Sequence, residues 1–222
     1  MNIATKIQLS ALEMELMQNK EWILTKRSII EKVCGLFGNM HGIYQEILEN
    51  ENLLAGVFSE HKFGKISKGE NYLGLPYVIL DSPAIFNKEN IFAIRTMFWW
   101  GNFFSISLHL SGKSLLSHKG AAQLFFYLKE KNFFICINEN EWEHNFDPTN
   151  YIHASKLKAI DRKKIFEKKF FKISKKIGLN SWENTPEFLE KTFKEIIEFV
   201  SLSFPAGEKA LLPVSPKVGS GL

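Results

Sequence analysis

Residues 91–111, with the sequence IFAIRTMFWW-GN-FFSISLHLS, form the segment that decides the fold. In the second half, apolar side chains alternate with Ser105, Ser107 and His109, which is typical of a strand with one face on a core. Gly101-Asn102 suits the two central positions of a type II′ turn. The segment therefore predicts an antiparallel hairpin.

A two-residue turn also fixes which residues of the hairpin face each other. Thr96 would lie opposite Ser107 and Arg95 opposite Leu108, so the Arg95 side chain would point into the apolar face. A buried guanidinium needs an anionic partner, because its desolvation is costly. Arg95 is therefore a candidate for binding a ligand carboxylate or phosphate. The alternatives are a structural ion pair with an internal acid, or a register shifted by one residue that places Arg95 outside.

Further strands and a helix are predicted on both sides of the hairpin. Residues 75–80 form a short β-rich run that ends at the turn residues Asp81-Ser82-Pro83. Residues 118–131 predict a helix and residues 133–137 a short buried strand, so that strand, helix and strand form a crossover unit. The expected sheet core is Val78, Leu80, Phe104, Ile106, Leu108, Leu110, Ile135 and Ile137.

Helices are predicted at both ends of the chain. Residues 3–37 follow the helical period along two apolar stripes, with a possible break at Asn19-Lys20 and a stop at Gly38-Asn39. A further helix is expected over 42–55. Near the C-terminus the pattern predicts a basic amphipathic helix over 156–177 and a final helix over 186–202.

The fold class follows from this order of elements. We expect an α+β protein with N-terminal helices, a central, mostly antiparallel sheet of about four or five strands, and C-terminal amphipathic helices. The helices at 118–131 and 186–202 are expected to cover one face of the sheet. We expect one domain over 1–204, made of a helical part (1–55), a sheet-rich part (63–138) and the C-terminal helices (156–202). Residues 205–222, which contain prolines and glycines, are expected to form an extended tail.

Composition excludes several classes of protein. Apolar residues make up 45% of the 222 residues and charged residues 23%, which is too apolar for a disordered chain. Two cysteines are too few for a disulfide scaffold, and no apolar run approaches a membrane span of roughly 18 residues. The N-terminal residues lack the layout of a signal peptide, so a cytoplasmic location is expected. No cofactor or metal motif is found, so neither is expected.

Positive charge is concentrated in one segment. Residues 156–176 hold ten basic and two acidic residues, whereas the chain as a whole has a net charge of +4. One interpretation of this segment is a surface for an anionic partner: an acidic protein, a membrane surface or, less favoured, nucleic acid. A solvated helix face is the alternative, because nine of the ten bases are lysines. The candidate partner-binding lysines are Lys163, Lys164, Lys168 and Lys169.

The tip of the hairpin is aromatic, from Phe98 to Phe104. If the helices cover it, these side chains are core. If it is exposed, Trp99 and Trp100 are candidates for binding a partner.

An acidic and histidine-containing loop is expected after the strand at 133–137. It includes Glu139, Glu141, Glu143, His144, Asp147 and His153, whose spacing matches no defined metal site. Asp147 and His153 are candidates for binding a ligand together with Arg95, Ser107 and His109. A plain polar loop is the alternative.

Three hypotheses about function follow. The first is a non-catalytic binding or accessory protein that recognises another macromolecule through the aromatic hairpin, the basic helix or the tail. The second is a small-molecule enzyme with an unfamiliar site between the polar hairpin face and the acidic loop. The third is nucleic-acid binding through 156–176. The sequence leaves open whether the protein is an enzyme.

Overall fold

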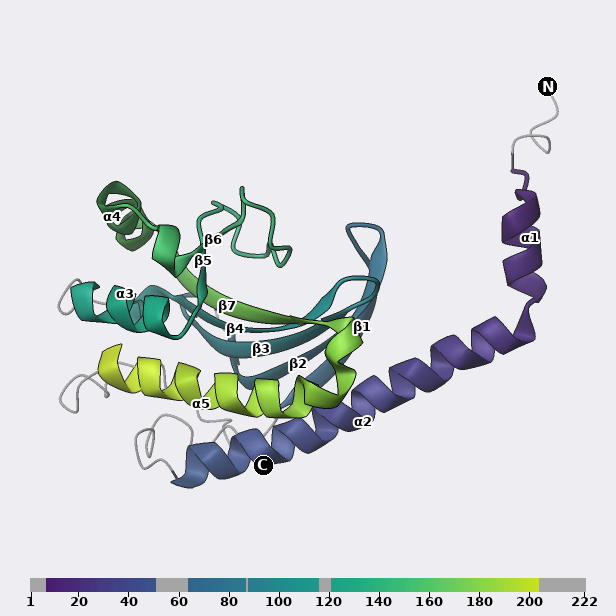
Figure 1. Cartoon of the computed structure of the whole chain (residues 1–222), viewed down its shortest axis with the longest axis horizontal. Helices are drawn as coiled ribbons and strands as arrows, with labels where there is room; N and C mark the ends of the chain where they lie inside the picture. The colour runs from purple at the N-terminus through teal and green to yellow at the C-terminus, as the bar shows by residue number, and fades with distance from the viewer. Residues whose placement is uncertain (1–6, 51–63, 87, 116–120, 204–222) are drawn as a thin grey trace, which may run out of the picture.

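The protein is built around a seven-stranded antiparallel sheet with the strand order β1-β2-β3-β4-β7-β5-β6 (Figure 1). A computed structural model describes residues 7–50, 64–86, 88–115 and 121–203. The predicted α+β class is confirmed, and the sheet has more strands than the four or five expected. The strands are β1 (Lys65–Tyr72), β2 (Leu75–Phe86), β3 (Ile91–Trp99), β4 (Phe103–Ser111), β5 (Phe134–Cys136), β6 (Tyr151–His153) and β7 (Phe170–Gly178).

Helices cover one face of this sheet, which we call the helix face. In Figure 1, α5 and part of α2 run beneath the strands, with α3 beside them. The Tyr44 ring of α2 stacks on Phe193 of α5 at 3.9 Å between centroids, so the two helices share one core with the sheet. The predicted cover by the helices at 118–131 and 186–202 is confirmed, and of the eight predicted core residues all but Ile137 are buried. The helices are α1 (Ala11–Gln18), α2 (Lys20–Asn50), α3 (Ala121–Glu130), α4 (Ala159–Glu167) and α5 (Thr185–Ser203), with short 3-10 helices η3 (Gly112–Ser114), η4 (Ala154–Lys156) and η5 (Leu179–Asn184).

The opposite face of the sheet is also covered, by residues 137–150. We call this segment the cover loop and the face beneath it the loop face. In Figure 1 the loop lies above the strands, between β5 and β6. Because both faces of β3 and β4 are buried, polar side chains on the loop face are enclosed in the protein rather than exposed to water.

The hairpin is confirmed, but its predicted register is wrong by one residue. Trp99 pairs with Phe103, so the connection contains Trp100 as well as Gly101-Asn102. Gly101 has φ +68°, the left-handed conformation that a glycine adopts without strain. Arg95 therefore faces Ser107 and lies on the loop face, while Thr96 lies on the helix face, where its hydroxyl is 3.1 Å from the Tyr44 hydroxyl.

Three predicted boundaries are also wrong. Strand β2 does not end at Asp81-Ser82-Pro83 but continues to Phe86, with a register shift between Asp81 and Ala84. Helix α2 continues through Gly38-Asn39 to Asn50, because Phe37, Met40 and Tyr44 are buried on its core side. The single helix predicted over 156–177 is instead α4 followed by strand β7.

The crossover unit is present in a split form. β4 and β5 both run antiparallel to β7, which lies between them, so β4 and β5 are parallel to each other and are connected through α3. The residues of the predicted tail, 205–222, lie outside the described part of the chain. Within the described residues, no helix is long and apolar enough to cross a bilayer.

Candidate functional site

A cluster of polar side chains lies between the sheet and the cover loop. Arg95, Ser107 and His109 come from the hairpin, Asp81 from β2 and Lys172 from β7. All of them alternate along their strands with side chains of the helix face. Because they are buried or nearly buried, their hydrogen bonds must be made within the protein.

Arg95 forms a two-point ion pair with Asp81, the residue opposite it on β2. Arg95 Nε lies 2.7 Å from Asp81 Oδ1, and Nη2 lies 2.9 Å from Oδ2. The guanidinium carbon is also 5.9 Å from the Phe86 ring centroid and 5.8 Å from that of Trp142. The structural ion pair with an internal acid, one of the alternatives weighed for Arg95, is therefore present.

Lys172 connects β7 to the backbone of the cover loop. Its side chain is almost completely buried, and Nζ donates to the carbonyl oxygens of Glu141 at 2.8 Å and Glu143 at 2.7 Å. Burial lowers the pKa of Lys172 from 10.5 to about 8, because the direct acceptors are neutral and compensate only part of the lost hydration. The lysine thus holds the cover loop against the sheet.

His144 lies between two cations. Its Nδ1 is 3.3 Å from Lys172 Nζ, and its Nε2 is 3.3 Å from Arg95 Nη1. Burial lowers the pKa of His144 well below 6.5, and Lys172 and Arg95 lower it further. The imidazole is therefore neutral near pH 7.

The His109 ring is also fixed by neighbouring side chains. Its Nε2 lies 2.8 Å from Glu141 Oε2, and its ring contacts those of Trp142 and Phe170 edge-on. Burial lowers the pKa of His109 to about 3, with Lys172 and Arg95 as further causes. The neutral imidazole consequently donates Nε2–H to the glutamate.

Tyr72 fixes the middle of the cover loop. Its hydroxyl donates to Glu143 Oε2 at 3.1 Å and accepts from the backbone N–H groups of His144 at 2.7 Å and Asn145 at 2.9 Å. Burial raises the pKa of Tyr72, which keeps the phenol protonated at neutral pH. The loop is thus attached to β1 as well as to β7.

Beside this cluster the structure has a cavity of about 280 Å³. Apolar and aromatic side chains form most of its wall, and Arg95 and His144 provide its cationic and imidazole groups. Trp142, which is 45% exposed, lies at its border with solvent. The lining residues are Tyr72, Tyr77, Ile79, Arg95, Met97, Trp142 and His144.

Of the five predicted ligand-binding residues, the structure brings three together. Arg95, Ser107 and His109 share the loop face; the pattern indicated this for Ser107 and His109, whereas the predicted register had placed Arg95 on the apolar face. Asp147 is exposed on the cover loop, and His153 on β6 bonds Ser155 through Nδ1 at 2.7 Å, so neither reaches the cavity. Ser107 Oγ bonds Ser174 Oγ at 2.8 Å instead of pairing with a histidine. Among the residues that the structure describes, no group of three or more His, Cys, Asp or Glu could hold a metal ion.

The two candidate tryptophans lie in the interior rather than on an open patch. Trp99 is 6% exposed and donates Nε1–H to the Tyr72 carbonyl at 3.2 Å. Trp100 is partly buried on the helix side, against Phe98. The interpretation of the hairpin tip as core fits these positions.

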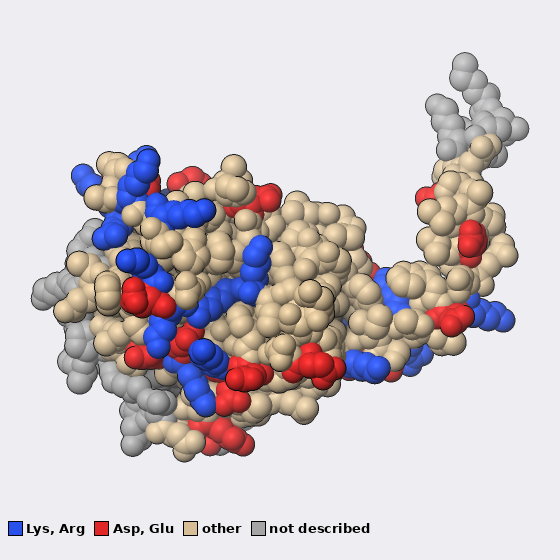
Figure 2. All heavy atoms as spheres, in the orientation of Figure 1, with Lys and Arg blue, Asp and Glu red and all other residues tan. Residues whose placement is uncertain are grey.

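The basic segment divides between a helix surface and the interior. Lys163, Lys164 and Lys169 are exposed, whereas Lys168 is partly buried and donates to the Asn138 carbonyl. Figure 2 shows Lys and Arg side chains gathered over α4, while the two signs of charge are intermixed elsewhere on the body. Because β7 sends Lys172 and Lys175 inward, the exposed positive patch is smaller than the sequence suggests.

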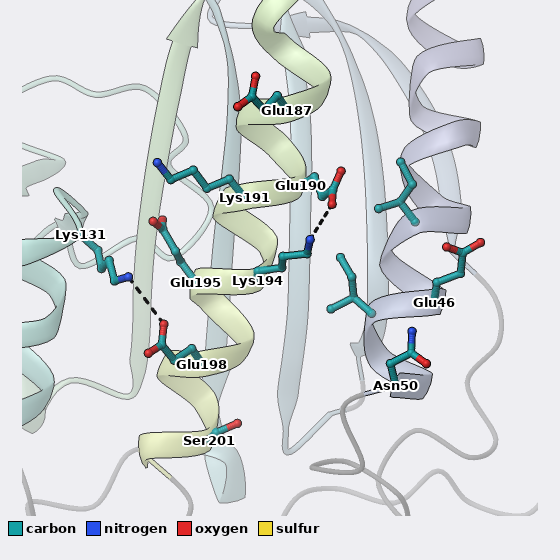
Figure 3. A pocket seen from close by; sticks show the side chains of 12 residues that line it. Glu46, Asn50, Lys131, Glu187, Glu190, Lys191, Lys194, Glu195, Glu198 and Ser201 are labelled. Atoms are coloured by element: carbon teal, nitrogen blue, oxygen red, sulfur yellow. Dashed lines mark hydrogen bonds and ion pairs between the residues drawn. The ribbon is translucent and has the colours of Figure 1, made fainter.

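A wide groove of about 880 Å³ lies between α2 and α5 (Figure 3). Its charged rim is largely paired: Lys194 lies 2.7 Å from Glu190, and Lys131 lies 3.7 Å from Glu198. Its lining holds five glutamates and three lysines, so the groove does not favour an anion.

The N-terminal arm is strongly exposed and is not among the sites predicted from the sequence. The arm consists of α1 and the start of α2, which extend away from the body in Figure 1; α1 contains no buried residue, and α2 reaches β1 at Ile23 and Lys26. We define the arm surface by its large apolar side chains, each 40–63% exposed. They are Leu9, Leu12, Met14, Leu16, Met17, Trp22, Ile23 and Leu24. The two apolar stripes of residues 3–37 were the available indication, because a helix packed on one core needs only one stripe.

Comparison of the chain with protein-family models, with curated proteins and with solved structures finds no match.

Proposed function

We propose that the protein is a non-catalytic binding protein that recognises another macromolecule through the arm surface. The observation that carries the proposal is the set of exposed apolar side chains on α1, its N-terminal flank and the start of α2, the part of the chain that extends from the body. Exposed apolar patches of this kind in folded proteins mark interaction sites. The proposal keeps the class of function expected from the sequence and places it on a different surface.

The geometry of α1 supports a partner that surrounds it. Leu12 and Met14 are two residues apart, so they lie on nearly opposite sides of the helix. A helix of only eight residues is not stable in water without packing, yet α1 has none against the body. Its capping box, in which Ser10 and Glu13 bond each other's backbone N–H groups, fixes where it begins but does not bury its apolar side chains.

The free energy available is large enough for a specific complex. The exposed fractions of the eight side chains correspond to about four fully exposed ones. Burying each contributes roughly 1.5–3 kcal/mol, so covering one arm would contribute on the order of 6–12 kcal/mol. This is comparable with the roughly 4–15 kcal/mol that association costs in lost freedom of motion, before the partner's own contacts are counted.

The other two hypotheses have weaker support. Ser107 bonds another serine, His109 a glutamate and Arg95 an aspartate, so these candidates form no pair of nucleophile and base. Nucleic-acid binding would depend on the exposed bases around α4, where Lys163 is within 3.9 Å of Glu167. Surface lysines of this kind are ordinary features of solvated helices.

The test compares the wild-type chain with an arm variant, Leu12→Lys with Leu16→Lys. A matched control carries Phe126→Lys with Leu202→Lys, two equally exposed apolar residues away from the arm. Sedimentation velocity of the purified proteins first shows whether the partner is a second copy. Quantitative pull-down from nuclease-treated extract, followed by titration of each purified candidate, covers other macromolecules.

We expect one stoichiometric partner that binds the wild type and the control equally and binds the arm variant at least tenfold more weakly. Hydrogen exchange of the α1 amides should slow in that complex, because their exchange depends on local opening. Equal behaviour of all three proteins, with no self-association and no arm-dependent partner, would contradict the proposal.

A further inference from the structure

The cavity under the cover loop contains two hydrogen-bond donors that point at each other. Lys172 is protonated near pH 7, because its pKa of about 8 lies above that pH, so it donates to His144 Nδ1. A neutral imidazole carries one proton, which must then be on Nε2. Nε2–H and the Arg95 Nη1–H group consequently meet at 3.3 Å, donor against donor.

Arg95 has further donors to offer. Its guanidinium has five N–H bonds, of which Asp81 accepts one from Nε and one from Nη2. One N–H remains on Nη2 and two on Nη1, and Arg95 lines the cavity together with His144. An acceptor placed in the cavity would therefore meet both residues at once.

The same two cations, Lys172 and Arg95, act on both imidazoles of the cluster. Apart from burial, the interactions that lower the pKa of His144 come from Lys172, Arg95 and His109. Those that lower the pKa of His109 come from Lys172 and Arg95. The carboxylates nearby already have partners of their own: Asp81 binds Arg95, Glu141 binds His109 and Glu143 binds Tyr72.

We propose that this cavity binds a small apolar carboxylic acid, whose carboxylate accepts hydrogen bonds from Arg95 Nη1 and His144 Nε2. The apolar part of the acid lies against Ile79 and Met97, which are 6% and 1% exposed and form the sheet side of the cavity. Tyr72 and Trp142 provide aromatic walls. The carboxylate supplies the acceptor that the two donors lack.

The size of the cavity limits the acid to a compact one. An engineered cavity of about 150 Å³ is sufficient to hold benzene, so about 280 Å³ holds a six-membered ring and a carboxylate. Sites for small molecules generally combine apolar walls with a few convergent polar groups, which is the arrangement here. This inference is independent of the proposed function, because no residue of the arm surface lines the cavity.

The experiment uses benzoate as the probe and benzamide, which has the same shape and no charge, as its control. Calorimetry and two-dimensional NMR of the full chain at pH 7 measure both affinities. Charge-assisted hydrogen bonds to a carboxylate are stronger than those to a neutral amide, so benzoate should bind about tenfold more tightly or better. NMR shifts should concentrate on Ile79, Met97 and the cover loop.

Two pairs of variants test the named contacts. Arg95→Lys keeps the charge but removes the planar set of donors, and Arg27→Lys makes the same change on the exposed surface of α2. His144→Gln can place an amide N–H near the Nε2 position, whereas His144→Asn is too short to do so. Benzoate selectivity should fall to less than about threefold in Arg95→Lys and His144→Asn, and persist in Arg27→Lys and His144→Gln.

No saturable benzoate binding to the wild type up to about 10 mM would overturn the proposal. Equal affinity for benzamide would also overturn it, as would selectivity that survives in both Arg95→Lys and His144→Asn. Far-UV circular dichroism of each variant confirms folding, and the two His144 variants decide the question if Arg95→Lys does not fold.

Discussion

Replacing Lys172 by methionine removes the buried ammonium group and keeps most of the apolar stem. The substitution loses the hydrogen bonds from Nζ to Glu141 O and Glu143 O, each worth roughly 1.5–3 kcal/mol when the donor is charged. It also removes the penalty of burying the charge, which a fall in pKa from 10.5 to about 8 sets at about 3 kcal/mol. These effects oppose each other, so the variant is expected to fold with modestly lower stability at pH 7.

The dependence of stability on pH is the sharper result. The pKa of Lys172 is lower in the folded state than in the unfolded state, so the unfolded chain binds more protons between about pH 8 and 10.5. The free energy of unfolding therefore rises with pH in this window. Between pH 7 and 9.5, Lys172 alone adds about 2 kcal/mol to the wild type. The Lys172→Met variant lacks this rise.

Urea unfolding followed by circular dichroism at pH 7, 8, 9 and 9.5 measures the effect in both proteins. Both proteins carry Cys136→Ser, because Lys172 lowers the pKa of that thiol and the two groups would otherwise titrate together. The difference between the two proteins then isolates Lys172, since Lys172 is not among the causes that raise the pKa of the buried Tyr151. Lys169→Met, at an exposed position, serves as the control and should follow the wild type. Parallel curves for the wild type and Lys172→Met, within about 0.5 kcal/mol, would refute the reasoning.

Three further changes in stability are expected, each measured by urea unfolding at pH 7. Asp81→Asn should destabilise the protein by about 3 kcal/mol, because it leaves the mostly buried Arg95 without its carboxylate. Glu31→Gln, which removes the carboxylate of the exposed ion pair with Arg27, is the control and should cost less than about 0.5 kcal/mol. Tyr44→Phe should cost about 1 kcal/mol through loss of the hydrogen bond to Thr96. Gly112→Ala should cost more than about 1 kcal/mol, because φ at this residue is +61° and the added methyl group would lie 1.9 Å from a backbone oxygen. Gly35→Ala is the control: its methyl group would have no atom within 4 Å, so the change should be neutral or stabilising.

The central hairpin could be predicted because its second strand alternates apolar and polar residues and Gly101-Asn102 marks a turn, and seven of the eight residues expected in the core are buried. The register could not, because Gly101-Asn102 resembles a complete two-residue turn and only packing shows that Trp100 belongs to the connection. That single residue moves Arg95 to the face of Ser107 and His109. The sequence grouped the three correctly as candidates, but for a reason that the structure does not bear out.

The segment 156–176 shows why periodicity failed elsewhere. Phe166, Phe170, Ile173 and Ile177 fit a helix, yet β7 begins at Phe170 and is buried on both faces. A strand that is covered on both faces carries apolar residues on both faces, so apolar and polar residues hardly alternate along it. Lys172 adds to the ambiguity, because a lysine is rarely buried and its partners are backbone carbonyls that no sequence pattern reveals. The position of the cover loop could not be predicted either, because it depends on Tyr72, a residue some seventy positions earlier in the chain.

The arm surface and the cavity are close to the same strand, so coupling between them can be judged from the structure. Lys26 of α2 lies 3.5 Å from Glu70 of β1, and Tyr72, two residues further along β1, lines the cavity. An exposed ion pair of this kind contributes less than about 1 kcal/mol, and no buried side chain of the arm joins the two places. We therefore expect nearly additive behaviour: the Leu12→Lys, Leu16→Lys variant should bind benzoate within about twofold of the wild type. A larger change would show that β1 transmits binding on the arm to the cover loop, and the two sites would then have to be treated as one.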